Sequence, residues 1–338
     1  MFQRRLPISI LAAAAAIAVT AVLGLTASAS VAATRQAPSS DFTLYTLPDQ
    51  GISWFDNLVK GAKTSIDLTM YELQDTTAED DLGAAAARGV DVRVILDQQE
   101  KSENQSAYNY LNSHGVDVVW SWSKYYYTHE KCMVVDGTTA AIMTLNLQSQ
   151  YYSTTRDFGV LDTDAKDISA IVKVFNADFA HKSVTPGDGA DLVWSPTDSQ
   201  TQLVSLIKGA KTSLKIYSEE MDDTTITNDL ASAAKRGVDV RVVGENTDGE
   251  YDSEYNTLYK AGVQISYYSS STGFYIHGKV IMADYNTSTS KIFIGSENFS
   301  ATSLNENREL GLIINDQAIE SSVNSSFTSD FAGGTRWT

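Results

Sequence analysis

Two histidine–lysine pairs stand at matching places in this 338-residue sequence: His129 with Lys131, and His277 with Lys279. An imidazole can attack phosphorus or transfer a proton near neutral pH, and an ammonium group stabilises the charge that develops on phosphoryl oxygens. Each pair is followed by a hydroxyl and an amide, which makes a group of four chemically useful side chains. Each group therefore predicts an anion site that contains a nucleophile or an acid. The later members are Thr144 and Asn146 in the first group, and Ser296 and Asn298 in the second.

We expect each group of four to lie on one face of a β-hairpin. Two apolar runs flank Asp136-Gly137, which is a strong signal for a two-residue turn. That turn pairs His129 with Thr144, and the equivalent register in the second copy pairs His277 with Ser296. Side chains two apart in a strand share a face with their cross-strand partners. The four side chains of each group should therefore project to the same side.

One group of four lacks a partner acid, so the chemistry requires both groups. Two groups that face each other across a pseudo-twofold axis would supply a nucleophile and an acid/base together. An acidic residue, Asp157 or Glu309, stands eleven residues after each asparagine. A carboxylate at that place can hold a histidine ring nitrogen and fix its tautomer.

The region around these groups is one unit written twice. Residues 60–65 recur as 208–213, and residues 88–94 recur as 236–242. The two halves cover residues 41–181 and 191–338, joined by a turn-rich linker at 182–190.

Each half alternates strands with helices, as in strand 65–71, a helix from Thr76 or Thr77 to Arg88, and strand 90–96. We therefore expect an α/β fold of two pseudo-twofold-related halves. Each half should be a mixed β-sheet flanked by helices, with the active site at their interface.

The sequence resembles the phospholipase D superfamily in its paired His-x-Lys-x4-Asp motifs and in the run 295–298, Gly-Ser-Glu-Asn. The resemblance covers nearly the whole mature chain. It implies a phosphodiesterase that forms a phosphohistidine and uses no metal or other cofactor. Under it, His129 is the nucleophile, and His277 protonates the leaving alcohol and then activates water or an acceptor alcohol. We interpret the motif aspartates, Asp136 and Asp284, as structural turn or salt-bridge residues.

Some positions depart from the pattern or lie beside it. Met143 replaces the motif glycine at a crowded place in the first half, yet no histidine, lysine or asparagine is lost. We interpret three acids near strand ends, Glu72, Glu219 and Glu220, as a charged rim. Cys132 is interpreted as a small buried hydrophobe.

The N-terminus is typical of an export signal. Arg4 and Arg5 precede an apolar run to about Leu25, and small residues follow. We expect a Sec-type signal peptide at residues 1–33, a flexible lead-in at 34–40, and a secreted protein with no transmembrane segment after cleavage. An uncleaved membrane anchor is the alternative. Since each half brings part of one site, the chain should act as a monomeric fused pseudo-dimer.

Charge separates the candidate substrates. Lys and Arg number 25 and Asp and Glu number 42, which gives a formal net charge of −17 and disfavours nucleic acid as a partner. Aromatic residues before both motifs suit a lipid interface. The preferred hypothesis is hydrolysis of phospholipid headgroups to phosphatidate and an alcohol, with transfer of the phosphatidyl group to another alcohol as a second outcome. The alternatives are a secreted metal-independent nuclease and a catalytically silent phosphate-binding module.

Overall fold

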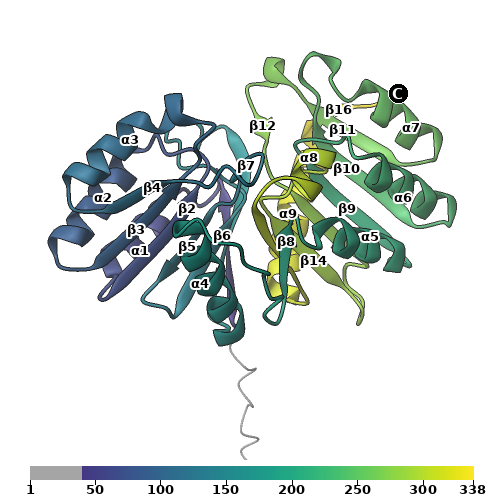
Figure 1. The fold of residues 1–338 in the computed structure, drawn as a ribbon. Helices are drawn as coiled ribbons and strands as arrows, with labels where there is room; N and C mark the ends of the chain where they lie inside the picture. The colour runs from purple at the N-terminus through teal and green to yellow at the C-terminus, as the bar shows by residue number, and fades with distance from the viewer. Residues whose placement is uncertain (1–39) are drawn as a thin grey trace, which may run out of the picture. The chain divides into compact units, whose positions relative to one another are not determined.

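The computed structural model describes residues 40–338, and Figure 1 shows the two sheets of this region with their helices. The expected signal peptide and all but the last residue of the lead-in lie outside the described residues. The first-half strands are β1 (Phe42–Leu47), β2 (Ser65–Met70), β3 (Asp91–Leu96), β4 (Asp117–Trp120), β5 (Cys132–Val135), β6 (Thr139–Met143) and β7 (Thr155–Asp162). The helices among them are α1 (Ser53–Gly61), α2 (Thr76–Ala87), α3 (Lys101–Ser113) and α4 (Ala165–Phe179).

The second half repeats this order. Its strands are β8 (Leu192–Ser195), β9 (Ser213–Ser218), β10 (Asp239–Glu245), β11 (Gln264–Tyr268), β12 (Tyr275–Ile276), β13 (Val280–Ala283), β14 (Lys291–Gly295), β15 (Glu309–Ile314) and β16 (Thr335–Arg336). Its helices are α5 (Ser199–Gly209), α6 (Thr224–Lys235), α7 (Asp252–Lys260), α8 (Ala301–Asn305) and α9 (Gln317–Gly333), with 3-10 turns η1 (Thr247–Gly249) and η2 (Ser270–Thr272).

Both sheets are mixed, as expected. The first runs β1-β7-β6-β5-β2-β3-β4, and the second runs β16-β11-β10-β9-β13-β14-β15-β8. In each sheet three neighbouring strands are parallel (β2, β3 and β4; β9, β10 and β11), and the hairpin that carries the His–Lys motif is antiparallel. The prediction of an α/β protein with two related halves is therefore confirmed.

Helix starts follow local capping chemistry. The helix predicted after strand 65–71 is α2, which begins at Thr76. Its N-cap is Asp75, whose carboxylate accepts a hydrogen bond from the Thr77 N–H. The equivalent Asp223 caps α6 through the Ile226 N–H. Carboxylates are strong N-caps because they satisfy free N–H groups and favour the positive end of the helix dipole.

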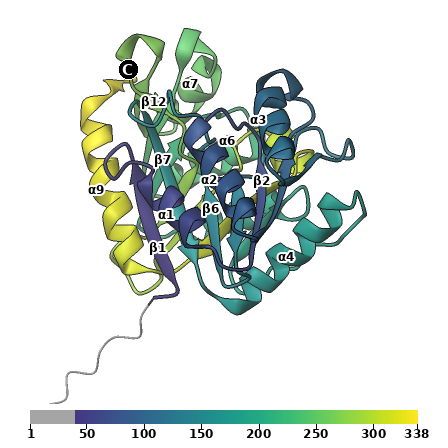
Figure 2. The same ribbon diagram turned by 90° about the vertical axis from the view of Figure 1, so that its left-hand side faces the viewer.

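Three hydrophobic cores hold the fold together. One lies between the first sheet and α1, α2 and α3, and another lies between the second sheet and α5, α6 and α7 (Figure 1). The third is shared by the inner faces of both sheets together with α4 and α9, and it includes Ile142, Val160, Val280 and Ile294. Figure 2 shows α9 on the left beside β1 and α4 at the lower right. A shared core of this kind makes the two halves pack as one body.

Two buried ion pairs repeat across this shared core. Arg156, on β7, binds Asp330 of α9 with Nε to Oδ2 at 2.7 Å, and Arg308, just before β15, binds Asp178 of α4 at 2.8 Å. Each arginine thus comes from one half and each aspartate from the other. The pairs are pseudo-symmetric, like the strands that carry them.

Candidate active site

Short backbone pairings bring each histidine to the opposite half. Ile276, which precedes His277, pairs in parallel with Arg156 at the start of β7. Thr128, which precedes His129, pairs in parallel with Arg308 in the same way. The residue after each arginine is the acid that the sequence singled out. The pairing therefore places each histidine beside the acid of the other half.

Both histidines bind a carboxylate across the interface. His129 Nδ1 lies 2.8 Å from Glu309 Oε2, and His277 Nδ1 lies 2.7 Å from Asp157 Oδ1. An Nδ1–H that donates to a carboxylate leaves Nε2 as the atom available for chemistry. The sequence predicted a carboxylate at a ring nitrogen, and the tertiary structure shows that the two carboxylates are exchanged between the halves.

The two carboxylates are held by neighbours of their own. Glu309 accepts hydrogen bonds from Ser303 Oγ at 2.5 Å and Asn307 Nδ2 at 2.9 Å, whereas Asp157 accepts one from Thr144 Oγ1 at 2.6 Å. Burial opposes their ionisation, but attraction to the histidines and lysines prevails and lowers the pKa of both acids. Both carboxylates are therefore charged partners for the imidazoles.

Burial gives His129 and Lys131 unusual charge states. Loss of hydration is the largest effect on both, and it outweighs the attraction of Glu309. The pKa of His129 falls to about 4, and the pKa of Lys131 falls to about 7. His129 is therefore neutral at neutral pH, which is the state that a nucleophile requires.

Each lysine turns back to its own histidine. Lys131 Nζ donates to the His129 carbonyl oxygen at 2.6 Å, and Lys279 Nζ donates to the His277 carbonyl oxygen at 2.5 Å. Lys131 Nζ also lies over the Tyr71 ring, 4.7 Å from its centre. Each ammonium group is thus held against the backbone of the histidine in its own motif.

The asparagines lie at the same site with free acceptors. Asn146 Nδ2 donates to Glu72 Oε2 at 3.2 Å, and the Asn298 N–H donates to Ser303 Oγ at 2.7 Å. Among the described residues, neither Asn146 Oδ1 nor Asn298 Oδ1 has a hydrogen-bond partner. A buried amide oxygen in this state suits a site that awaits a donor from a ligand.

The predicted hairpin register is wrong by one residue. Cys132 pairs with Ile142, and the Met143 N–H donates to the Lys131 carbonyl oxygen at 2.9 Å, so Thr144 does not lie opposite His129. The cause is a three-residue loop that begins at Asp136, whose φ is +53°. The second hairpin shows the same shift, because Val280 pairs with Ile294.

The side chains still converge because regular strand geometry ends before the motif residues. β5 starts at Cys132, so alternation along the strand does not govern Lys131. Ser296 occupies the same kind of place as Thr144: its Oγ accepts from the Leu310 N–H at 3.2 Å, and Thr144 Oγ1 accepts from the Phe158 N–H at 2.9 Å.

Met143 lies in the core between the first sheet and its helices, and it is fully buried there. The crowding expected at this position therefore falls on the core and not on the active site. In the second half, a Cβ at Gly295 would collide with the carboxylate of the buried Glu297. The glycine makes room for that acid, and the first half has Met143 and Leu145 in the two places.

The motif aspartates anchor loops, and neither makes an ion pair in the described chain. Asp136 accepts from the N–H groups of residues 63, 64 and 65 at 2.7–3.1 Å, and Asp284 accepts from those of residues 211, 212 and 213 at 2.6–3.2 Å. Although burial opposes it, these hydrogen bonds lower the pKa of both acids. The interpretation as structural turn residues agrees with this geometry.

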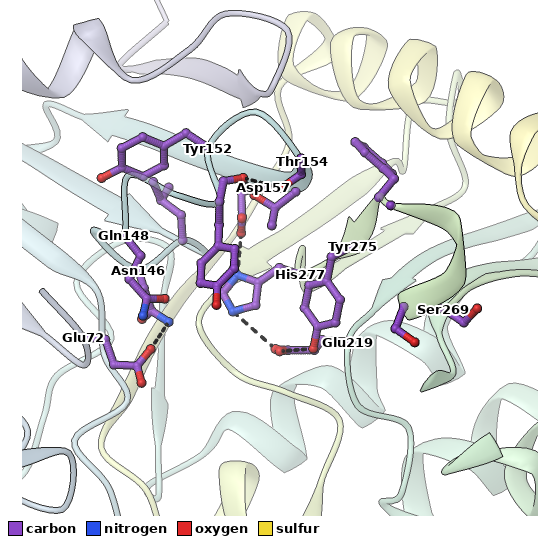
Figure 3. Close-up of a pocket in the computed structure, with 16 residues that line it drawn as sticks. Glu72, Asn146, Gln148, Tyr152, Thr154, Asp157, Glu219, Ser269, Tyr275 and His277 are labelled. Carbon is purple, nitrogen blue, oxygen red and sulfur yellow. Dashed lines mark hydrogen bonds and ion pairs between the residues drawn. The ribbon is translucent and has the colours of Figure 1, made fainter. Parts of the chain in front are cut away.

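Two cavities open on the pair of histidines, and each combines one histidine with the other half's asparagine. The larger, of about 540 Å³, is lined by His277 and Asn146 together with Tyr151, Tyr152, Phe274 and Tyr275. The smaller, of about 240 Å³, is lined by His129 and Asn298 together with Tyr126 and Tyr127. Figure 3 shows His277 in the larger cavity between Asp157 and Glu219.

The acids expected to form a charged rim are part of the site. Glu72 and Glu219 line the larger cavity, and Glu220 lines the smaller one. Glu219 Oε2 lies 2.5 Å from Lys279 Nζ and 3.6 Å from His277 Nε2. The sequence signal that could have found Glu219 is the repeat itself, since the equivalent first-half residue is Tyr71.

Residues 40–338 contain no group of three or more His, Cys, Asp or Glu side chains arranged to hold a metal ion. Nor does this part of the chain include a helix with the length and apolar character needed to span a membrane.

The two-halved fold and the paired His–Lys site define a protein of the phospholipase D superfamily, as the sequence resemblance predicted. A family model described as cardiolipin synthase, PLD-like domain matches residues 56–181 and 203–331, so the chain belongs to that family.

Curated relatives with similar sequences are also named cardiolipin synthase. A cardiolipin synthase of Clostridium perfringens is 24% identical over 291 residues, which cover 72% of this chain and 60% of the relative. A cardiolipin synthase of Halalkalibacterium halodurans is 25% identical over 222 residues, which cover 56% of this chain and 43% of the relative. The chain thus spans about half of the length of these relatives.

Solved structures share the fold. The phosphatidylserine synthase of Haemophilus influenzae superposes with a TM-score of 0.64 at 12% identity, covering 86% of each chain. The polyphosphate kinase of Porphyromonas gingivalis gives 0.66 at 14% identity, covering 87% of this chain and 52% of the kinase.

Proposed function

We propose that this protein is a phospholipase D-type phosphodiesterase that acts on the headgroup phosphodiester of phospholipids. It releases the headgroup alcohol and passes the phosphatidyl group to water, which yields phosphatidate, or to a second alcohol. The observation that carries the chemistry is a pair of His–carboxylate hydrogen bonds, 2.8 Å and 2.7 Å long. Each joins a histidine of one half to a carboxylate of the other half. The relatives named cardiolipin synthase support transfer to an alcohol alongside hydrolysis.

The first step forms a covalent intermediate. Neutral His129 attacks phosphorus through Nε2, an N–P bond forms, and the P–O bond to the headgroup breaks. The headgroup oxygen takes a proton from His277 Nε2. Lys131 and Lys279 stabilise the charge on the phosphoryl oxygens, and Asn146 and Asn298 hold the substrate.

The second step reverses the proton movement. His277 Nε2 removes a proton from water or from an acceptor alcohol, and the oxygen attacks phosphorus. The N–P bond breaks and its electron pair returns to His129. Glu309 holds the Nδ1 proton of His129 throughout, so Nε2 carries the bond changes.

Exposed aromatic rings around the cavities support a lipid interface as the place of action. Tyr126 is 54% exposed beside the smaller cavity, and Tyr151 is 50% exposed beside the larger one. Tyrosine suits such a boundary because its ring is apolar and its hydroxyl is polar. We further propose that the chain is exported through its N-terminal segment and works as a monomer, since it supplies both histidines itself.

The test is turnover of mixed vesicles of phosphatidylcholine, phosphatidylethanolamine and phosphatidylglycerol, with lipid products measured by mass spectrometry. His129→Ala should abolish the formation of phosphatidate and of transfer products, because no N–P bond can form. The matched control is His114→Ala, since His114 is exposed and lines neither cavity. Unchanged lipids with the unaltered protein, or degradation of plasmid DNA in their place, would contradict the proposal.

A further inference from the structure

One residue breaks the symmetry between the two halves of the site. Tyr71 and Glu219 occupy equivalent places, each directly after the first of the three parallel strands of its half, β2 or β9. The structure supports this equivalence because Leu73 bridges to Leu147 and Met221 bridges to Phe299, at matching repeat positions. A neutral aromatic ring in one half therefore corresponds to a carboxylate in the other.

The two residues contact equivalent partners in different ways. Tyr71 places its ring under Lys131 Nζ and against the His129 ring, with ring centres 4.6 Å apart. Glu219 instead forms an ion pair with Lys279 Nζ at 2.5 Å and reaches His277 Nε2 at 3.6 Å. Its other oxygen accepts a hydrogen bond from the Tyr275 hydroxyl at 2.9 Å, as Figure 3 shows.

Glu219 is an ionised group inside the site. Burial opposes its charge, but attraction to His277 and Lys279 prevails and lowers its pKa well below the ordinary value. Its carboxylate thus lies where a phosphoryl oxygen would meet Lys279. In the first half the equivalent atoms make no such contact. In the described chain no carboxylate lies within 4.0 Å of His129 Nε2 or of Lys131 Nζ.

We propose that Glu219 is a positioning residue that directs the phosphoryl group to His129. This inference rests on the proposed phosphodiesterase function and adds the reason for its direction. A phosphodiester anion that approaches Lys279 meets the paired charge of Glu219, whereas Lys131 Nζ lies over the Tyr71 ring and forms no ion pair with a carboxylate in the described chain. Like charges a few ångströms apart repel strongly in a partly buried site. The anion therefore binds nearer the first-half pair, and His129 Nε2 becomes the attacking atom.

The first experiment measures sulfate binding by calorimetry and needs no turnover. Glu219→Gln keeps the size of the side chain and removes its charge, so it should tighten sulfate binding by about tenfold or more. Lys131→Gln should weaken binding to the unaltered protein by about tenfold, and Lys279→Gln should weaken it far less. The matched control is Asp117→Asn, which removes the same charge at an exposed place on β4.

The second experiment locates the covalent phosphoryl group. The protein is mixed with bis(p-nitrophenyl) phosphate and quenched in alkali, and the phosphohistidine is mapped by peptide mass spectrometry. The unaltered protein should carry the label on His129 alone. Glu219→Gln, and Glu219→Tyr, which copies the first half, should carry it on both His129 and His277.

The outcomes separate the two proposals. Label on His277 in the unaltered protein, or label confined to His129 in both variants, would overturn the role of Glu219. Sulfate affinity in Glu219→Gln equal to that of the unaltered protein would overturn it as well. Absence of label from every protein would count against the phosphodiesterase function, and the sulfate measurements would still decide the role of Glu219.

Discussion

Lys131 shows how burial decides the charge of a single functional group. The residue is 1% exposed, and loss of hydration lowers the pKa of its ammonium group to about 7. The nearby carboxylates, Glu309, Glu219 and Glu72, oppose this shift, and the ammonium group of Lys279 adds to it. The sequence identifies the lysine, but only its surroundings show that it titrates near neutral pH.

The pKa of Lys131 predicts a pH dependence for anion binding. As pH rises through about 7, the ammonium group loses its proton, so sulfate affinity should fall, by at most about tenfold per pH unit. The measurement is calorimetry with sulfate, which keeps its charge across pH 6–9. Lys131→Arg should flatten this dependence because a guanidinium remains charged. An equal decline in the arginine variant would show that another group is responsible.

At the scale of elements, the two hairpins that carry the His–Lys motifs fill equivalent buried positions with different side chains. β6 ends at Met143, which lies with Leu145 in the helix-covered core, whereas β14 ends at Gly295, and the buried carboxylate of Glu297 occupies the space beside that glycine. Glu297 is fully buried, and neither carboxyl oxygen has a hydrogen-bond partner among the described residues. Burial and the repulsion of Glu309 raise its pKa well above the ordinary value.

This difference predicts that Glu297→Leu, the residue of the other half, stabilises the protein. A buried polar group without a partner costs about 1–3 kcal/mol, so the free energy of unfolding at neutral pH should rise by about that amount. The unaltered protein should also lose stability as pH rises above the ordinary pKa of glutamate, because the folded state favours the protonated acid. The variant should lose this part of the pH dependence.

Urea denaturation at several pH values measures both effects. The reverse change, Leu145→Glu, serves as the control and should destabilise the first half, because Met143 leaves no room for the carboxylate. A lower free energy of unfolding for Glu297→Leu at neutral pH would mean that the acid has a partner that stabilises it.

At the scale of the whole molecule, two crossed ion pairs join the halves around one site. Arg156 and Asp330 are both buried, and Asp330 also accepts a hydrogen bond from Tyr217 at 2.6 Å. Because β7 carries both Arg156 and Asp157, the same contact that joins the halves also sets the carboxylate of His277. Stability and the geometry of the candidate site therefore depend on one interface.

Arg156→Met should destabilise the molecule by about 3–5 kcal/mol, because it leaves Asp330 as an unpaired buried charge. Adding Asp330→Leu should restore part of that loss, since no buried charge then remains without a partner, and Asp49, which also pairs with Arg156, is exposed. Thermal unfolding of the two variants and of the unaltered protein gives the comparison. A double variant less stable than Arg156→Met, or a single variant within about 1 kcal/mol of the unaltered protein, would exclude this account.

The sequence by itself determined the repeat and the α/β class, and it named the two His–Lys pairs, whose functional role stays a prediction. Local chemistry explains this success: glycine and apolar patterns mark elements, and the His–Lys spacing recurs in register in both copies. Only the tertiary structure decided that Glu309 serves His129 and Asp157 serves His277, because that exchange depends on pairings between residues far apart in the chain.

The hairpin register and the place of Glu219 were likewise decided by the tertiary structure. A positive φ at Asp136 adds a third loop residue that the turn pattern does not encode. Glu219 resembled a solvated rim residue because the sequence shows its charge and hides its neighbours. The folded chain buries the Glu219 carboxylate against Lys279 and His277, and these contacts, which the sequence does not show, place its charge inside the site.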